Sequence, residues 1–191
     1  MHALTPLPLP AARWEGLRWV DSLVERARNG DVAAFEELAE RHLPDAYRLA
    51  LGVVGPDDAR DVAQDALVSA WRTLPKLRDT DRFASWLHAI VMNRARNALR
   101  SRRRHPTVRL EAEHDSLLPA EPMTDVHLRM TLESTLAHLR PDIRGVFVLH
   151  YVLDLPLREV ARIMDIREGT AKSRLNAGLS TLRRHLKDRS L

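Results

Sequence analysis

The chain has 191 residues and a net charge of +4. Because 45% of its residues are hydrophobic, a chain of this length can build one large packed core or two small ones. It contains no cysteine, which excludes disulfides, thiolate metal sites and thiol-based redox sensing. The N-terminus lacks the basic and then apolar pattern of an export signal, and there is no apolar run long enough to span a bilayer. We therefore expect a soluble cytoplasmic protein without membrane insertion.

Charge is sorted along the chain into four blocks. Residues 21–75 hold 6 basic and 11 acidic side chains, whereas residues 76–109 hold 10 and 2. Residues 110–142 hold 2 basic and 7 acidic side chains, and residues 143–191 hold 10 basic and 5 acidic ones. Two separate basic blocks are typical of a protein that contacts a polyanion twice and has acidic surfaces for another partner.

Helical periodicity dominates the sequence and no strand-like alternation appears, which predicts an all-α fold. Residues 1–19 form an N-terminal extension with three prolines. A short helix is expected over 22–28, with Asp21 as its cap, and a longer one after the cap Asp31, with a kink at Pro44. Two further helices are expected over about 56–74 and 81–104.

The helix expected over 56–74 has one apolar and one acidic face. Asp57, Asp61, Gln64 and Asp65 share the acidic face with Val68. A helix with such a face is expected to be an ordinary solvated one, although the apolar valine among the acidic residues weakens that interpretation.

The helix expected over 81–104 carries a polar and basic stripe. Asn93, Asn97, Arg100 and Arg104 follow helical spacing, and Arg96 lies beside them. Asparagine lowers helix stability in a helix interior, so two of them on a basic face indicate a use in recognition, although plain surface polarity is the alternative.

Residues 106–124 contain three prolines and little periodicity, which predicts a flexible linker between two helical domains. Four more helices are expected after it, over about 125–139, 141–152, 156–164 and 168–187. The last two are joined by Asp165-Ile166-Arg167, a turn of the length found in a helix-turn-helix. The final helix would then be the recognition helix that enters a major groove.

The final helix has an apolar stripe and a face with small polar residues at its start and basic residues at its end. A solvated helix is the alternative to a helix that approaches DNA closely. In the recognition reading, the early residues would face base edges and the later arginines would contact phosphates. This face holds Ser173, Asn176, Ala177, Ser180, Arg183, Arg184 and Lys187, and Lys172 and Arg174 flank it.

Four segments, in this order, resemble the extracytoplasmic-function (ECF) sigma factors of bacterial RNA polymerase, of the sigma-70 family. They read GDVAAFEELAERHLPDAYRLAL, DARDVAQDALVSAW, FASWLHAIVMNRARNALRSRRR and LRPDIRGVFVLHYVLDLPLREVARIMDIREGTAKSRL. The resemblance implies a sigma-2-like domain over 20–105 and a sigma-4-like helix-turn-helix domain over 125–191. Arg167, Glu168 and Ala171 depart from the family pattern.

The resemblance also implies functions for particular residues. Asp61, Gln64 and Asp65 would bind core polymerase at the β′ clamp helices, and the sigma-4-like domain would contact the β flap. Asn93, Arg96, Asn97, Arg100 and Arg104 would contact the −10 element of promoter DNA and help to melt it. Lys172, Ser173, Asn176, Ala177, Arg183 and Arg184 would contact the −35 element. An anti-sigma factor is a further expected partner.

Two other function classes fit the sequence less well. A stand-alone helix-turn-helix regulator explains the last 50 residues but gives no role to DARDVAQDALVSAW. An enzyme is disfavoured, because the nine histidines are scattered without metal-ligand spacing or a nucleophile partner and no phosphate-binding glycine loop occurs. We expect no metal and no cofactor.

Overall fold

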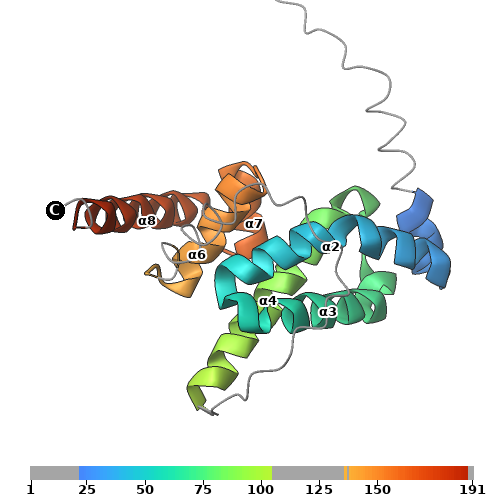
Figure 1. The fold of residues 1–191 in the computed structure, drawn as a ribbon. Helices are drawn as coiled ribbons and strands as arrows, with labels where there is room; N and C mark the ends of the chain where they lie inside the picture. Colours follow the sequence, from blue (N-terminus) through green and yellow to red (C-terminus); the bar gives the residue numbers. More distant parts are fainter. Residues whose placement is uncertain (1–21, 105–135, 137, 189–191) are drawn as a thin grey trace, which may run out of the picture.

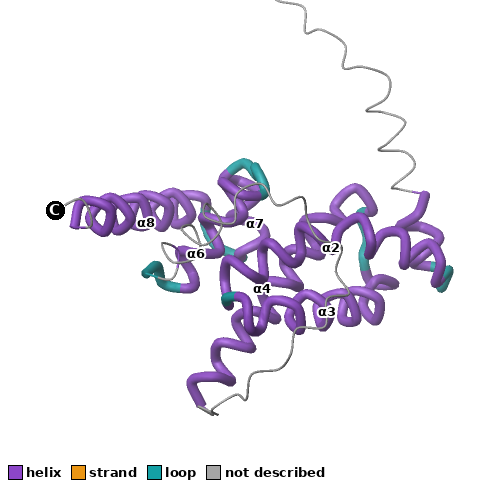
Figure 2. The backbone as a smooth tube through the Cα atoms, viewed as in Figure 1, coloured by secondary structure: helices purple, strands orange, loops and turns teal. Residues whose placement is uncertain are grey.

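The structure, a computed structural model, describes residues 22–104, 136 and 138–188 (Figure 1). Throughout these ranges the backbone consists of helices and the loops that join them (Figure 2). We call residues 22–104 the N-terminal unit, and residue 136 with residues 138–188 the C-terminal unit. The all-α prediction is confirmed for the described residues.

The N-terminal unit begins with a helix over 22–28, which ends in a turn at Asn29 and Gly30. Gly30 has a φ of 93°, a left-handed conformation that glycine adopts without steric cost. The helix α2 (Val32–Val54) follows, and the Asp31 carboxylate caps it by accepting a hydrogen bond of 3.1 Å from the Ala34 backbone N–H. α2 continues through Pro44.

Gly55, with a φ of 87°, turns the chain into α3 (Pro56–Thr73), and Pro56 occupies the first turn, where a missing N–H costs nothing. Two short 3₁₀ helices, η1 (Leu74–Lys76) and η2 (Thr80–Arg82), lead to α4 (Phe83–Arg104). α4 therefore begins two residues later than expected. The helices α2, α3 and α4 pack on one another as a bundle (Figure 1).

The C-terminal unit contains α6 (Pro141–Phe147), η3 (Val148–Val152), α7 (Leu157–Met164) and α8 (Glu168–Asp188). The helix expected over 141–152 changes its hydrogen bonding midway, since η3 is a π-helix in which the Leu153 N–H donates to the Val148 carbonyl at 3.0 Å. The expected helix over 125–139 lies mostly outside the described residues, and Leu139 itself is in a bend. Asp21 and residues 106–124 also lie outside them.

Buried side chains form two clusters. The smaller one joins the helix over 22–28 to the first half of α2, the end of α3 and the start of α4. The larger one contains residues of α2, α3 and α4 together with residues of α6, η3, α7 and α8. The two units therefore share one continuous apolar core, which the sequence pattern did not predict.

Candidate nucleic-acid interface

The polar stripe of α4 faces solvent over most of its length. Asn93, Asn97, Arg100 and Arg104 are exposed, whereas Arg96 is half-buried. Each asparagine is paired with the arginine three residues later. Arg96 Nη1 donates to Asn93 Oδ1 at 3.3 Å and Arg100 Nη2 donates to Asn97 Oδ1 at 2.6 Å. These bonds orient the amide groups, whose N–H₂ ends remain available as donors.

Two further arginines tie α4 to α3, and the sequence reasoning assigned them no such role. Arg102 makes ion pairs with Asp57 at 2.9 Å and with Asp58 at 3.1 Å, and Arg94 donates to Ser69 Oγ at 3.0 Å. Asp57 and Asp58 belong to the first turn of α3, where acidic side chains also complement the helix dipole. The basic end of α4 is thereby held beside the start of α3.

The acidic face of α3 is exposed as predicted. Asp61, Gln64 and Asp65 all point to solvent, and Val68, 49% exposed, is one of the few exposed large apolar side chains among the described residues. The buried alanines and Val62 on the other side of α3 pack into the core. Substitutions on the exposed face can therefore change binding without changing the fold.

The helices α7 and α8 are joined by the predicted tight turn. Asp165 adopts a left-handed conformation with a φ of 54°, and the Ile166 N–H reaches back to the Ala161 carbonyl at 2.9 Å. α8 then starts at Glu168. This is the geometry of a helix-turn-helix, with α8 as its second helix.

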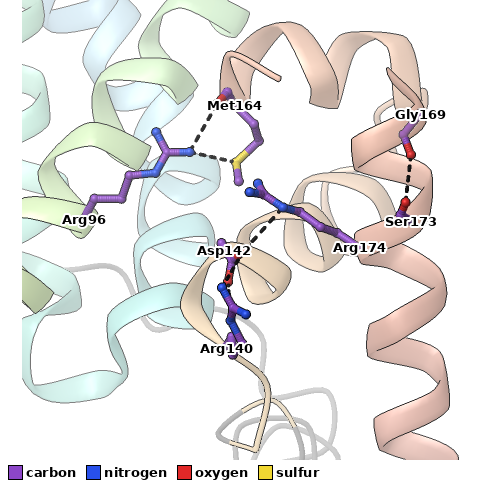
Figure 3. A network of polar contacts seen from close by, with 7 residues as sticks. All are labelled: Arg96, Arg140, Asp142, Met164, Gly169, Ser173 and Arg174. Atoms are coloured by element: carbon purple, nitrogen blue, oxygen red, sulfur yellow. Dashed lines mark hydrogen bonds and ion pairs between the residues drawn. The ribbon is translucent and has the colours of Figure 1, made fainter. Parts of the chain in front are cut away.

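The predicted recognition face of α8 is exposed. Ser173 Oγ donates a hydrogen bond of 3.1 Å to the Gly169 carbonyl of the same helix (Figure 3). The Ser173 hydroxyl therefore offers mainly its acceptor lone pairs to a partner. The exposed residues are Lys172, Ser173, Asn176, Ala177, Arg183 and Arg184.

A glycine inside α8 has a packing reason that the sequence did not reveal. A Cβ atom at Gly178 would lie 2.3 Å from Phe147 Cε2 and 2.9 Å from Ile143 Cγ2, both on α6 or at its end. Gly178 therefore allows α6 and α8 to approach closely. At Gly169, by contrast, a Cβ atom would meet no atom within 4 Å.

The side chain of Arg96 leaves the α4 stripe and reaches the C-terminal unit (Figure 3). Its Nη2 donates to the carbonyl of Met164 at 3.3 Å and approaches Met164 Sδ at 3.5 Å. Met164 ends α7, where carbonyls lack helical partners and a cation is favourable. Burial, and then the nearby charges of Arg174 and Arg100, lower the pKa of the Arg96 guanidinium.

Arg174 lies close to this contact and was predicted only to flank the recognition face. Its Nε forms an ion pair with Asp142 Oδ2 at 3.4 Å, and Arg140 pairs with the other oxygen at 3.2 Å (Figure 3). The Arg174 side chain is 27% exposed. It therefore connects α8 to the first turn of α6.

Within the ranges that the structure describes, no three His, Asp or Glu side chains are arranged to hold a metal ion. Among the same residues, no helix combines the length and the apolar character that crossing a bilayer requires.

Comparison with known proteins assigns both units. The model of Sigma-70 region 2 matches residues 38–105, and that of Sigma-70 region 4 matches residues 129–182. The ECF RNA polymerase sigma-E factor of Escherichia coli (strain K12) is 32% identical over 165 residues, which cover 80% of this chain and 86% of that protein. The chain belongs to the ECF sigma factors.

A second relative and one solved structure agree with this family, and a further solved structure shares the fold. The ECF RNA polymerase sigma factor SigW of Bacillus subtilis (strain 168) is 27% identical over 86% of this chain and 95% of its own length. The structure of CnrH in complex with the cytosolic domain of CnrY is similar to this one, with a TM-score of 0.67 and a sequence identity of 26%. The match covers 88% of this chain and 97% of the CnrH chain. RpoE of Bartonella quintana, solved with the anti-sigma factor NepR, has the same fold, with a TM-score of 0.63 and 24% identity over 82% of this chain and 98% of its own.

Membership of this family makes the protein an alternative sigma factor, which acts in transcription initiation with RNA polymerase and promoter DNA. The match to region 2 also gives a place to DARDVAQDALVSAW, the segment that a stand-alone DNA-binding regulator left without a role.

Proposed function

We propose that this sigma factor binds core polymerase, reads the −35 element with α8 and reads and melts the −10 element with α4. The main support is that each of the two regions matched by a family model contains a helix with exposed asparagine in its earlier turns and several arginines in its later turns. On α4 these are Asn93 and Asn97, and on α8 the asparagine is Asn176. An amide can donate and accept at once, as reading a base edge requires, while arginines suit phosphates.

The two helices would read different forms of DNA. The exposed start of α8, after a helix-turn-helix turn, fits the major groove of duplex DNA. The amide groups of Asn93 and Asn97, held by neighbouring arginines, suit the polar edges of bases that have left the stack. Capture of such bases would favour the open form of the −10 region.

The acidic face of α3 would bind the β′ clamp helices through Asp61, Gln64 and Asp65, and Val68 would add apolar contact. The C-terminal unit would contact the β flap. An anti-sigma factor is a further proposed partner, since CnrH and the Bartonella quintana RpoE were both solved in complexes, the latter with a named anti-sigma factor.

Run-off transcription with purified core polymerase on a genomic promoter library tests this function. We expect transcripts that depend on the added protein and that share −35 and −10 sequences. The double charge reversal D61R/D65R should abolish most of this activity by weakening core binding, while reversal at Glu36 and Glu37, exposed on α2, serves as the control. Equal activity of D61R/D65R and parent would contradict the role of α3, and no dependent transcripts would contradict the function.

A further inference from the structure

Four arginine side chains come together between the two units. Arg96 and Arg100 belong to α4, Arg174 belongs to α8, and Arg140 directly precedes α6. Figure 3 shows the side chains of Arg96 and Arg174 reaching toward each other from their two helices. Arg140 joins them through Asp142, whose carboxylate pairs with Arg140 at 3.2 Å and with Arg174 at 3.4 Å. We call these four arginines the arginine cluster.

The positive charge of the arginine cluster is only partly balanced. Burial lowers the pKa of Arg96 most, and the charges of Arg174 and Arg100 lower it further. Asp142 and Asp165 are the carboxylates that act on Arg96 in the opposite direction. Four guanidinium groups therefore face two carboxylates, and two positive charges are left over. Their repulsion is costly here, because Arg96 is half-buried and the Arg174 side chain is only 27% exposed.

The arginine cluster also holds unused hydrogen-bond donors. A guanidinium group carries five N–H donors. Within the described residues, Arg174 contacts Asp142 through Nε, and its two terminal nitrogens make no hydrogen bond. Arg96 donates from its terminal nitrogens to Asn93 and Met164, while its Nε makes no hydrogen bond in the same part of the chain. An anion with several oxygens could accept from both arginines at once.

We propose that the arginine cluster is a binding site for a doubly charged phosphate group, either free phosphate or the monoester of a small molecule. Such a group carries a charge of about −1.5 to −2 at neutral pH and three acceptor oxygens. It therefore matches the two surplus charges, and planar guanidinium groups bind its oxygens in pairs. A carboxylate or a DNA phosphodiester carries a single negative charge and would leave half of the surplus unbalanced.

This site differs from both proposed DNA-reading faces. It needs Arg140 and Arg174, which the proposed function assigns to neither promoter element, together with Arg96 and Arg100 of the −10 stripe. A phosphate bound here would engage Arg96 and so oppose its use on −10 DNA. Only this consequence rests on the proposed function, since binding of phosphate itself requires neither polymerase nor promoter.

Isothermal titration calorimetry of the full chain with inorganic phosphate, at constant ionic strength and neutral pH, tests the site. We expect saturable binding of one phosphate per chain. Arg174→Gln should weaken it by about tenfold or more, because it removes a charged donor group. Arg158→Gln, at an exposed arginine of α7 outside the cluster, should change it less than about twofold. Equal losses in the two variants, or no saturable binding by the parent, would overturn the proposal.

Two aspartates provide a second test that leaves every arginine in place. Asp165 and Asp154 are both exposed and both left-handed, with φ values of 54° and 52°, and asparagine tolerates this conformation. Only Asp165 acts on Arg96. Asp165→Asn should therefore strengthen phosphate binding several-fold, whereas Asp154→Asn removes the same charge elsewhere and should have little effect. Equal changes in the two variants would show that only the net charge of the protein attracts the anion.

Titration with adenosine monophosphate and with adenosine identifies the source of the phosphate. Tighter binding of the nucleotide than of inorganic phosphate would support a phosphate monoester as the ligand, and equal binding would support the phosphate group alone. Binding of adenosine as tight as that of the nucleotide would overturn the proposal, because the phosphate would then contribute nothing. These titrations contain no polymerase and no promoter DNA, so their failure would leave the proposed function standing.

Discussion

His88 is a polar residue of the described core whose burial is not compensated by hydrogen bonds. It is 4% exposed, and neither ring nitrogen has a hydrogen-bond partner. Burial lowers its pKa from 6.5 to about 4, against the charges of Asp45 and Glu159, which raise it, while His42 lowers it further. Burial also lowers the pKa of His42, which packs beside Phe83 at a ring distance of 5.2 Å. Both histidines are thus held neutral.

We expect the protein to lose stability in mild acid because of His88. The unfolded chain takes up a proton near pH 6.5, whereas folded His88 does so only near pH 4. The contribution is therefore complete above pH 6.5 and is lost as the pH falls towards 4, by about 3 kcal/mol for this shift. Urea unfolding of the parent and His88→Leu between pH 7.5 and 4.5 measures it, and the variant should show a flatter dependence.

Leu87→Ala is the matched control, since Leu87 is the buried neighbour of His88 on α4 and carries no titratable group. Its pH dependence should follow that of the parent. Parallel curves for the parent and His88→Leu would show that His88 does not titrate in this way.

At the scale of single helices, the two glycines of α8 make a matched pair. Gly178→Ala should destabilise the protein by about 1–3 kcal/mol, because its methyl group meets the Phe147 ring and Ile143. Gly169→Ala places the same group in open space and should be neutral or stabilising by up to about 1 kcal/mol through helix propensity. Thermal unfolding of both variants decides this, and equal midpoints would contradict the packing role of Gly178.

The recognition face of α8 gives a second prediction at this scale. Asn176→Ala should change which −35 sequences are preferred, because discrimination between bases at the contacted position should fall by about 1–3 kcal/mol. The salt dependence of binding should change little. Arg184→Ala should weaken all promoters alike and lower the slope of log affinity against log salt by about one. Because the Ser173 hydroxyl already donates to Gly169, we expect Ser173→Ala to matter less than Asn176→Ala. Promoter titrations with holoenzyme on a −35 library, at several salt concentrations, test both, and identical base preferences for Asn176→Ala and the parent would contradict base reading.

Local chemistry made the helices predictable. Asp31 caps α2, Gly55 and Pro56 open α3, and Asp165 turns the chain between α7 and α8, each through a preference confined to a few neighbouring residues. The exposed sides of α3, α4 and α8 followed from helical periodicity for the same reason. Periodicity did not predict η3, because apolar residues that fit an α-helix there also fit a π-helix.

At the scale of the whole molecule, the shared core makes a prediction about unfolding. Two independently folded units would unfold separately, whereas one continuous cluster of buried side chains couples them. We expect calorimetry of the free protein to show one transition whose van't Hoff and calorimetric enthalpies agree. Gly52→Ala should split or broaden it, since a Cβ atom at Gly52 of α2 would lie 2.3 Å from Val148 Cγ2 of η3, where the two units pack on each other. Two resolved transitions in the parent would show that the units are uncoupled.

The contact between the two units could not be found from the sequence, because nothing local marks it. Met92 and Val148 have the pattern of ordinary core residues, and an apolar residue does not reveal which unit covers it. Arg96 carried a clear basic signal, and its bond to Met164 joins residues 68 positions apart. Contacts at that separation depend on the packing of whole helices, which periodicity does not specify.

Gly52 of α2 and Gly145 of α6, each of which faces the other unit, should have different evolutionary histories. The atom that confronts Gly145 is the flexible end of Met92, which can move aside, so natural variants with alanine at 145 would be tolerated without a partner change. The atom that confronts Gly52 belongs to a β-branched valine with little freedom. A substitution at position 52 should therefore be accompanied by a substitution at position 148, and the two positions should covary among related proteins.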